Sequence, residues 1–415
     1  MAAPAESRII ACHECDHLHL SKPISEGSKA LCTKCGYLLY RQVNNSIDKT
    51  LALYLAAFVL MIIANSFPFL SLQIGGRAEH NILISGALAL HYLGMSELGL
   101  LVFMTSVLFP LLVIIGMLYL LFPAWLGIEP PAKGIVYRAV KALQPWSLVS
   151  VFVLGVLIAI VKLLDLAEVI PGIALFAMFA MLVIMTSIYF VFEPSTIWPH
   201  TRVSEIKLHG HGKTAAQQNL MSCHTCSLLI PMSGQHSNCP RCNSPLHSRI
   251  NNSIARTWAL IFTAVLLLIP ANLYPIMTVI RFGQGEPDTI LSGVIHLVEG
   301  GMWPLALIVF FASIFVPFLK LIVLSLLAIT VQNRSSWRTR DRTLLYRVTE
   351  VIGAWSMVDI FLIGLLAALV NLGALATIRP GIGAIFFAAA VIITIFAAHN
   401  FDSRLIWDNA EETNG

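Results

Sequence analysis

Long stretches without charge alternate with short polar segments along this chain of 415 residues. A helix needs about 20 apolar residues to cross the roughly 30 Å hydrocarbon core of a bilayer. Eight runs meet or approach this length, and two of them contain one internal charge: 51–76, 98–128, 142–161, 169–192, 257–280, 300–332, 351–378 and 380–401. The pattern therefore predicts eight membrane-spanning helices.

The second half of the chain repeats the first. Residues 41–85 align with residues 248–292 at a constant offset of 207 and without a gap. Later landmarks also match: Ser106 with Ser313 at the same offset, and Trp146 with Trp355 and Trp198 with Trp407 at an offset of 209, because one connection differs by two residues. Each repeat then holds four spans, and an even number means that the copies are parallel. The predicted fold class is an all-α polytopic membrane protein built from two parallel four-helix repeats.

Composition and charge agree with this class and give it an orientation. The chain is 57% hydrophobic and 12% charged, with a mean hydropathy of +0.79, which excludes an ordinary soluble domain. With the N-terminus inside, 21 of the 26 Lys and Arg residues are cytosolic, and only Arg77, Arg281 and Arg379 lie opposite. We therefore expect both termini in the cytosol. The net charge of +4 follows from this topology, and no nucleic-acid partner is inferred.

The cysteines indicate metal sites ahead of each repeat. They form four Cys-x-x-Cys pairs: Cys12/Cys15, Cys32/Cys35, Cys223/Cys226 and Cys239/Cys242. Paired knuckles at this spacing are typical of zinc ribbons, and disulfides would not persist in a reducing cytosol. Four thiolates close a tetrahedral coordination sphere, so the prediction is two structural Zn²⁺ ions. Iron in the same ligand set, or a dithiol redox pair, remains an alternative.

These patterns divide the chain into five parts. They are a first ribbon (1–48), the first membrane repeat (49–200), a linker with the second ribbon (201–255), the second repeat (256–402) and a disordered tail (403–415). Two motifs imitate catalytic sites. His13–His17 reads His-Glu-x-x-His but crosses a cysteine knuckle, and the P-loop-like ending at Gly212 lacks the required glycine at position 207. No enzymatic activity is predicted.

Four charged residues fall inside predicted spans, where each costs roughly 2.5–3.5 kcal/mol to insert. Lys320 and Asp359 lie at similar depths in neighbouring antiparallel spans, so they are expected to pair. The pair is either a protonatable switch or a structural link between helices. Lys162 and Asp165 share one helical face near the outer end of the third span, where the lysine could instead reach the interface. None of the four has a charged counterpart in the other repeat.

Uncharged polar residues extend the candidate intramembrane set. Asn65 and Asn272 each stand in an Ala-Asn-x-x-Pro motif, where an amide could satisfy a carbonyl freed by a proline kink. Ser313, Ser356 and Thr394 could continue a polar path, although single hydroxyls more often bond their own helix.

Several motifs together resemble the paraquat-inducible protein A family of bacterial inner-membrane proteins, which includes the LetA-type proteins. They are CHECD with CTKCG, CHTC with CPRCN, IPANLYPI, DTILSG, ASIFVPFLK, WSMVDIF and FDSRLIWD. Ala354 departs from the pattern, which has an arginine before WSM. The resemblance implies a partner, an MCE-domain protein that forms a tunnel for lipid across the periplasm. It also implies a proton-responsive network at Lys162, Asp165, Ser313, Lys320, Ser356, Asp359 and Thr394.

The leading hypothesis is an inner-membrane transport component that loads or receives phospholipid at the mouth of such a tunnel. Proton movement through Lys320 and Asp359 would bias two conformations. A second hypothesis is a scaffold that docks the tunnel protein, with its charges serving helix packing alone. A third is a membrane thiol oxidoreductase that uses its Cys-x-x-Cys pairs.

Overall fold

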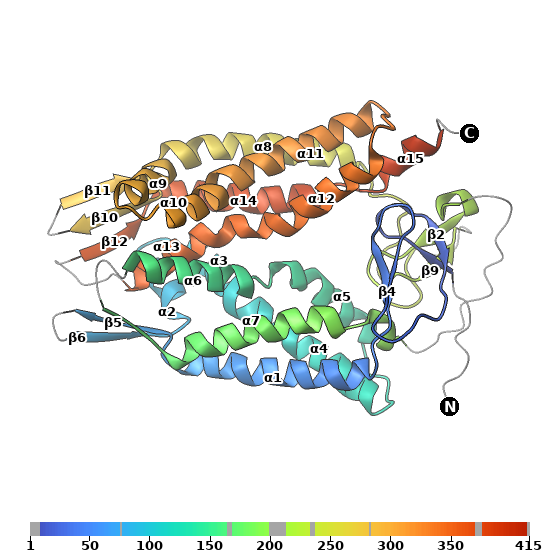
Figure 1. Ribbon diagram of the computed structural model, residues 1–415, viewed down its shortest axis with the longest axis horizontal. Helices are drawn as coiled ribbons and strands as arrows, with labels where there is room; N and C mark the ends of the chain where they lie inside the picture. The colour runs from blue at the N-terminus through green and yellow to red at the C-terminus, as the bar shows by residue number, and fades with distance from the viewer. Residues whose placement is uncertain are drawn as a thin grey trace.

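The computed structural model describes residues 9–74, 77–163, 168–198, 213–232, 237–281, 284–369 and 376–412. Two helical bundles lie side by side, one for each repeat (Figure 1). The cysteine ribbons gather at one end, here called the ribbon end, and two small sheets lie at the other, the sheet end (Figure 1). This arrangement separates the predicted metal sites from the sheets by the full length of the bundle.

Within the described residues, eight helices are long and apolar enough to cross a membrane, as predicted. In the first repeat they are α1 (Ser46–Ser66), α3–η1–α4 (Ser96–Phe103, Met104–Leu108, Phe109–Trp125), α5–η2–α6 (Lys133–Leu143, Gln144–Trp146, Val149–Leu163) and α7 (Ile173–Val191). In the second they are α8 (Ser253–Leu273), α10–η5–α11 (Trp303–Phe310, Phe311–Phe315, Val316–Gln332), α12–η6–α13 (Thr339–Gly353, Ala354–Met357, Val358–Leu369) and α14 (Ile382–Asn400). The fold class of two parallel four-helix repeats is confirmed.

The sheets at the sheet end were not predicted. Each has three antiparallel strands: β6–β5–β7 (Arg77–Asn81, Leu70–Ile74, Glu168–Pro171) and β11–β10–β12 (Gln284–Asp288, Met277–Arg281, Ala376–Pro380). The central strands are apolar and directly follow the first span of each repeat, so they resembled a continuation of that span. Short helices α2 (Ser85–Tyr92) and α9 (Ile290–Glu299) follow the two hairpins. Spans one and five are therefore shorter than the apolar runs suggested.

The two repeats meet through their third spans. Every residue of α13 is buried, and this helix packs on α2 and α6 of the first repeat. Small residues allow the close approach: a Cβ on Gly155 would lie 3.2 Å from the Cβ of Phe361. Phe152 also meets Phe361 edge to face, with ring centroids 5.4 Å apart. Glycine at such contacts is typical of packing between membrane helices.

The cysteine-bearing end of each ribbon packs on the repeat that does not follow it in sequence. The first ribbon (β1 Ile9–Ala11, β2 Leu18–Leu20, β3 Lys29–Leu31, β4 Leu38–Arg41) contributes its cysteines to a cluster with α11, α12 and the C-terminal helix α15 (Leu405–Glu412). The second (η4 Ala216–Gln218, β8 Leu220–Ser222, β9 Leu229–Pro231) packs on α5 and Trp198 of the first repeat. The ribbons thus cross between the repeats.

Matching residues make the two crossed contacts. Arg347 of α12 donates to the Cys35 carbonyl at 3.3 Å, and its counterpart Arg138 of α5 donates to the Asn243 carbonyl at 2.9 Å. Lys34 lies over the ring of Trp407, and the matching Arg241 lies over Trp198. Because matched residues make both sets of contacts, each ribbon packs on the opposite repeat in the same way.

The tail from residue 403 was expected to be disordered, and for its first part this was wrong. Ser403 and Arg404 are buried, and α15 follows. Ile406 and Trp407 pack into the cluster around the first ribbon, and the acidic Asp408 lies in the first turn of this anchored helix. Short 3₁₀ segment η3 (Pro194–Thr196) stands at the corresponding place in the first repeat.

Candidate functional site

Each repeat contains a π-helical turn at the same place in its second span. These turns, η1 and η5, carry Ser106 and Ser313 at their centres. π-helical turns insert one residue into a helix and often mark functional sites. Ser106 donates to the Val102 carbonyl at 2.7 Å, whereas the similarly buried Ser313 hydroxyl has no hydrogen-bond partner among the described residues. The serine of the π-helical turn thus bonds its own helix in the first repeat, whereas in the second repeat its hydroxyl is available to another group.

Lys320 lies in α11, one to two turns beyond this π-helical turn, and is only 2% exposed. Its Nζ donates to Thr394 Oγ1 at 2.9 Å and to the Gly353 carbonyl at 3.4 Å. Thr394 in turn donates to the Val391 carbonyl, and Ser356 donates to the Gly353 carbonyl. A buried amine is therefore held between α14 and the end of α12. This group is called the lysine cluster: Lys320, Gly353, Ser356 and Thr394.

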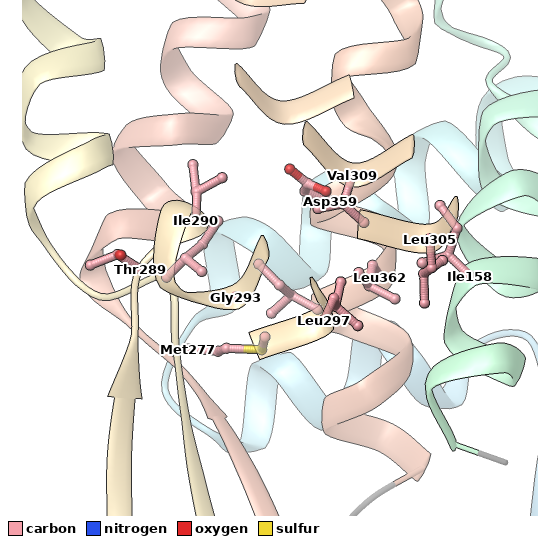
Figure 2. Close-up of a pocket in the computed structure, with 12 residues that line it drawn as sticks. Ile158, Met277, Thr289, Ile290, Gly293, Leu297, Leu305, Val309, Asp359 and Leu362 are labelled. Atoms are coloured by element: carbon pink, nitrogen blue, oxygen red, sulfur yellow. The ribbon is translucent and has the colours of Figure 1, made fainter. Parts of the chain in front are cut away.

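The expected ion pair between Lys320 and Asp359 is not formed, although both residues are described. Asp359 instead lies in the first turn of α13 and lines a small cavity of about 40 Å³ (Figure 2). The cavity is otherwise apolar apart from Thr289, and its walls come from β10, α9, α10, α13 and Ile158 of the first repeat. This volume can hold one or two water molecules. The charged residues are thus separated into an amine held by hydrogen bonds and a carboxylate facing a cavity.

The two asparagines serve their own helices. Asn65 Nδ2 donates to the Met61 carbonyl, and Asn272 Nδ2 donates to the Leu268 carbonyl, each at 2.8 Å. The prolines of both motifs follow the last residue of their helix, so they end α1 and α8 and do not kink them. Each asparagine amide therefore bonds a carbonyl of its own helix, and no hydrogen bond joins it to another span among the described residues. Lys162 lies in α6, but its side chain and all of Asp165 are outside the described residues, as is the P-loop-like Gly212.

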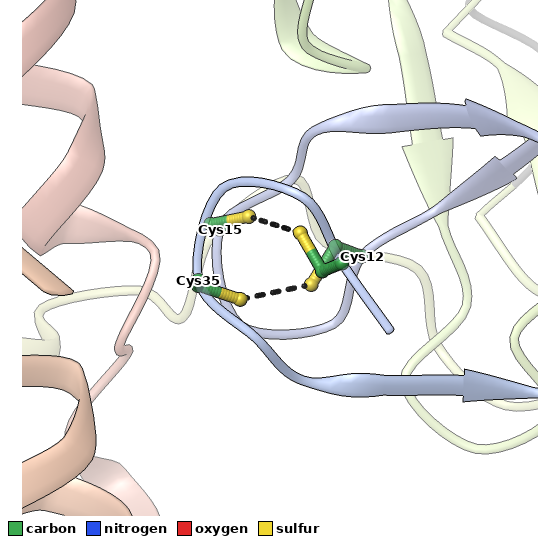
Figure 3. A group of neighbouring side chains, drawn as sticks. Cys12, Cys15 and Cys35 are labelled. Atoms are coloured by element: carbon green, nitrogen blue, oxygen red, sulfur yellow. Dashed lines mark hydrogen bonds between the residues drawn. The ribbon is translucent and has the colours of Figure 1, made fainter. Parts of the chain in front are cut away.

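At the ribbon end, the eight cysteines form the two predicted groups of four. All are buried, and within each group the sulfur atoms lie within 4.8 Å of one another. Cys12 Sγ is 3.5 Å from Cys35 Sγ in the first group (Figure 3). In the second group, Cys223 Sγ is 3.6 Å from Cys242 Sγ. Tetrahedral zinc with bonds of about 2.3 Å would place its sulfurs about 3.8 Å apart. Each group therefore fits a four-thiolate metal site.

The backbone explains why the thiols converge. The residue after each knuckle has a positive φ: Asp16, Gly36, Ser227 and Asn243. In every knuckle the first cysteine also receives a turn hydrogen bond from the residue after the second, as from Asp16 N to Cys12 O at 2.9 Å. The left-handed residue reverses the chain so that both sulfurs point inward. His13–His17 forms part of this turn and not a metalloprotease helix.

Charged residues connect the two ribbons with the C-terminal segment. Asp402 binds Arg404 at 2.8 Å, and the same guanidinium donates to His224 Nε2 at 2.8 Å. Burial alone would raise the pKa of Asp402, but the hydrogen bonds and charge of Arg404 hold that pKa below its usual value. Burial, together with the charge of Arg404, lowers the pKa of His224 to about 4. His224 is therefore a neutral acceptor. Arg249 likewise joins Asp16 to Asp408.

Two functional candidates were missed by the sequence analysis. Gly353 places its carbonyl at the lysine amine, and a Cβ there would lie 3.0 Å from Lys320 Nζ. Arg347 reaches Cys35 Sγ at 3.2 Å, beside a metal ligand. Neither had a local signal, because one is a glycine at a helix end and the other belongs to a basic loop-like stretch. Only the folded helices bring them to their partners.

The comparisons with known proteins agree with the two-repeat architecture. Residues 47–202 and 254–411 match the family model described as Paraquat-inducible protein A, one match for each membrane repeat. The chain belongs to the paraquat-inducible protein A family. The resemblance seen in the sequence motifs is thereby confirmed.

Individual relatives are similar over nearly their whole length. The chain is 32% identical over 406 residues to intermembrane transport protein PqiA of Escherichia coli K12, covering 97% of this chain and 96% of the relative. It is 31% identical over 407 residues to lipophilic envelope-spanning tunnel protein A of the same strain, covering 97% and 92%. No solved structure matches the chain. The relatives' names support a role in membrane transport.

Proposed function

We propose that this protein is the inner-membrane component of a system that moves phospholipid between the bacterial membranes. It would load or receive lipid at the periplasmic mouth of a tunnel formed by an MCE-domain partner. The names of its relatives, one an intermembrane transport protein and one an envelope-spanning tunnel protein, support this assignment. The charge asymmetry of the loops favours cytosolic ribbons and termini, which directs the sheet end toward the periplasm.

The observation that carries the proposal is the pair of buried charged groups in the second repeat. Lys320 is held by Thr394 and Gly353, and Asp359 faces a cavity toward the sheet end. Charged groups at membrane depth are costly and usually serve transport or proton transfer. Their counterparts in the first repeat are Val113 and Ser150, so the architecture does not require them. A function beyond packing explains why one repeat alone carries them.

The proposed mechanism uses protonation to choose between two arrangements of α11, α12–η6–α13 and α14. A Lys320 amine that loses its proton keeps two N–H donors but gains a lone pair that can accept a hydrogen bond, and a protonated Asp359 can donate where the carboxylate only accepts. One or two water molecules in the adjoining cavity, between Asp359 and Thr289, would give the carboxyl group a route for proton exchange. The hydrogen-bond pattern would then favour one helix arrangement in each protonation state.

The two ribbons would bind zinc as structural caps. When bound, Zn²⁺ supplies folding energy through four thiolates and has no open position for substrate. The crossed packing means that each cap would hold the ribbon end of the opposite repeat in place. Arg347 and Arg138 would orient the caps through the carbonyls at or beside the last cysteine of each.

Substitution of the two charged residues tests the proposal. Cells lacking the native protein are complemented with Asp359→Asn, Lys320→Met or the matched control Ser150→Ala, and their resistance to detergent is measured at equal protein level. We expect the first two variants to lose most of the protection and Ser150→Ala to retain it. Full protection by both charge variants would overturn the transport role of these residues.

The rival hypotheses predict other results. A scaffold whose charges only pack helices would lose function in proportion to lost protein, so thermal stability and abundance are measured in parallel. A thiol oxidoreductase would contain reactive cysteines and substoichiometric metal. Metal analysis of the purified protein is expected to give about two zinc per chain, as the two four-thiolate sites require.

A further inference from the structure

A long apolar groove runs along the second repeat between α8 and α11. It has a volume of about 740 Å³, and twelve residues of these two helices line it. The lining is uncharged, and Asn272 and Ser325 are its polar members. Both walls are membrane spans, and several lining side chains are exposed, including Ile269 at 53% and Ile322 at 64%. The groove therefore opens on the surface that faces the bilayer.

Several residues that line the groove correspond to larger side chains in the first repeat, although Phe318 corresponds to the smaller Leu111 and Leu273 to the smaller Ser66. At the repeat offset of 207, Ser325 corresponds to Leu118 and Val265 to Phe58. Three further aliphatic residues of the groove correspond to aromatic ones: Ile261 to Tyr54, Leu326 to Tyr119, and Ile329 to Phe122. Tyr54 belongs to the buried core, and Phe58 and Leu118 pack against it. Helix α1 accordingly packs more extensively on α4 than α8 does on α11.

The dimensions of the groove fit one chain of a membrane lipid. On α8 the lining extends from Ile261 to Leu273, and twelve residue steps of 1.5 Å give about 18 Å. One leaflet of a bilayer has a hydrocarbon thickness of about 15 Å, half of the full core. Asn272 stands at the sheet end of the groove, where a leaflet would meet its polar interface. The groove is therefore uncharged, and its length is close to that of an acyl chain that spans one leaflet.

We propose that the α8–α11 groove binds one acyl chain of a phospholipid, with the headgroup near Asn272 at the sheet end. The inference rests on the proposed lipid transport and adds a place where the substrate is held within the second repeat. The groove is separate from the Asp359 cavity, since no residue lines both. An acyl chain in this position would lie against the outer side of α11, the helix that carries Lys320.

Photolabelling of the full-length protein tests the site. The protein is placed in nanodiscs of phosphatidylethanolamine and phosphatidylglycerol that contain a phosphatidylethanolamine with a diazirine midway along one acyl chain. Crosslinked peptides are then mapped by mass spectrometry. We expect α8 and α11 to be labelled at least about tenfold more than α1 and α4, which corresponds to burial of about two methylene groups.

Variants that exchange the residues of the two repeats supply the controls. Ser325→Leu with Val265→Phe should close the groove and reduce its labelling about tenfold, while labelling elsewhere is unchanged. Leu118→Ser with Phe58→Val makes the opposite change in the first repeat and should create new labelling there. Circular dichroism and thermal unfolding identify variants that fail to fold, in which case Ser325→Leu alone is used.

The outcomes separate this inference from the proposed function. Equal labelling of both repeats in the native protein, or undiminished labelling of the closed variant, would overturn the site. A closed variant that loses its label but fully protects cells would also overturn it, while lipid transport itself would stand. If the Asp359 and Lys320 variants protect cells fully, the proposed function fails whatever the labelling pattern. Loss of both label and protection in the closed variant supports the inference.

Discussion

The two repeats share one backbone plan and differ in what their interiors contain. In the first, Ser106 bonds its own helix, Val113 stands where the second repeat has Lys320, and aromatic side chains fill the space between α1 and α4. In the second, the Ser313 hydroxyl is unpartnered, a lysine is buried, and a groove lies open between α8 and α11. The two bundles thus share a backbone plan but differ at the position of Lys320 and in the side chains between their first and second spans.

We interpret the first repeat as a support for the second. Its third span, α6, packs on α13, whose first turn carries Asp359. Close packing against α6 would hold α13 in place while the contacts of α13 with other helices of the second repeat change, because closely packed side chains have little room to shift. Substitutions at matched positions of the two repeats therefore test this interpretation.

The largest expected effect comes from removing the metal ligands of one ribbon. Because each ribbon packs on the opposite bundle, Cys12→Ser with Cys35→Ser should loosen α12 and α15, whereas Cys223→Ser with Cys242→Ser should loosen α5. Loss of a structural zinc site removes roughly 10 kcal/mol or more of binding energy. We expect hydrogen exchange in the affected helices to be at least about tenfold faster. Faster exchange confined to the helices of the following repeat would contradict the crossed arrangement.

A smaller effect is expected from the buried ion pair at the end of the second repeat. Asp402 and Arg404 are 3% and 4% exposed, so Asp402→Ala leaves a buried guanidinium without its carboxylate. Removing one partner of such a pair costs about 3–5 kcal/mol. The matched residue Glu193 is half-buried, and Glu193→Ala should cost about 1 kcal/mol or less. Chemical unfolding of both variants measures the contrast, and equal losses would show that the two ends are equivalent.

The sequence predicted those features that depend on local pattern. Apolar runs gave the eight spans, the offset of 207 gave the repeat, and Cys-x-x-Cys spacing gave both thiolate clusters. Span length and knuckle geometry are determined by short local segments, and the repeat is visible because the two copies can be aligned directly in the sequence. The sheets were missed for a related reason: strand β5 begins four residues after α1 and is equally apolar, so length alone assigned both to one span.

The remaining features depend on contacts between distant segments. Lys320 and Asp359 have similar predicted depths, yet the amine turns to Thr394 of α14, a residue 74 positions away. Depth along a helix says nothing about the direction in which a side chain points. The crossing of the ribbons is likewise invisible in sequence, since the connection to each following repeat suggests the opposite arrangement. The groove could have been found by comparing the repeats residue by residue, because Leu118 and Ser325 already differ in size.

Gly353→Ala should weaken the lysine cluster without removing any polar group. The added methyl would lie 3.0 Å from Lys320 Nζ, so the amine must shift away from the Gly353 carbonyl. Weakening a hydrogen bond of about 1 kcal/mol should reduce protection of complemented cells about fivefold at equal protein level. Gln144→Ala at the matched position of the first repeat is the control and should have no effect. Equal protection of cells by the two variants would show that the lysine cluster has no function that the matched position of the first repeat lacks.

The smallest expected effect separates the two matched tryptophans that contact the ribbons. Trp407 Nε1 donates to Thr343 Oγ1 at 3.0 Å, whereas the buried Trp198 Nε1 has no hydrogen-bond partner in the part of the chain that the structure describes. The residue that corresponds to Thr343 is Gly134, which has no side chain to accept the bond and approaches Cys242 closely. Trp407→Phe should therefore cost about 1 kcal/mol beyond its packing loss, while Trp198→Phe removes an unsatisfied donor and should cost less. Thermal unfolding of the two variants measures the difference. A greater loss for Trp198→Phe would mean that the first repeat, and not the second, holds its ribbon through this indole.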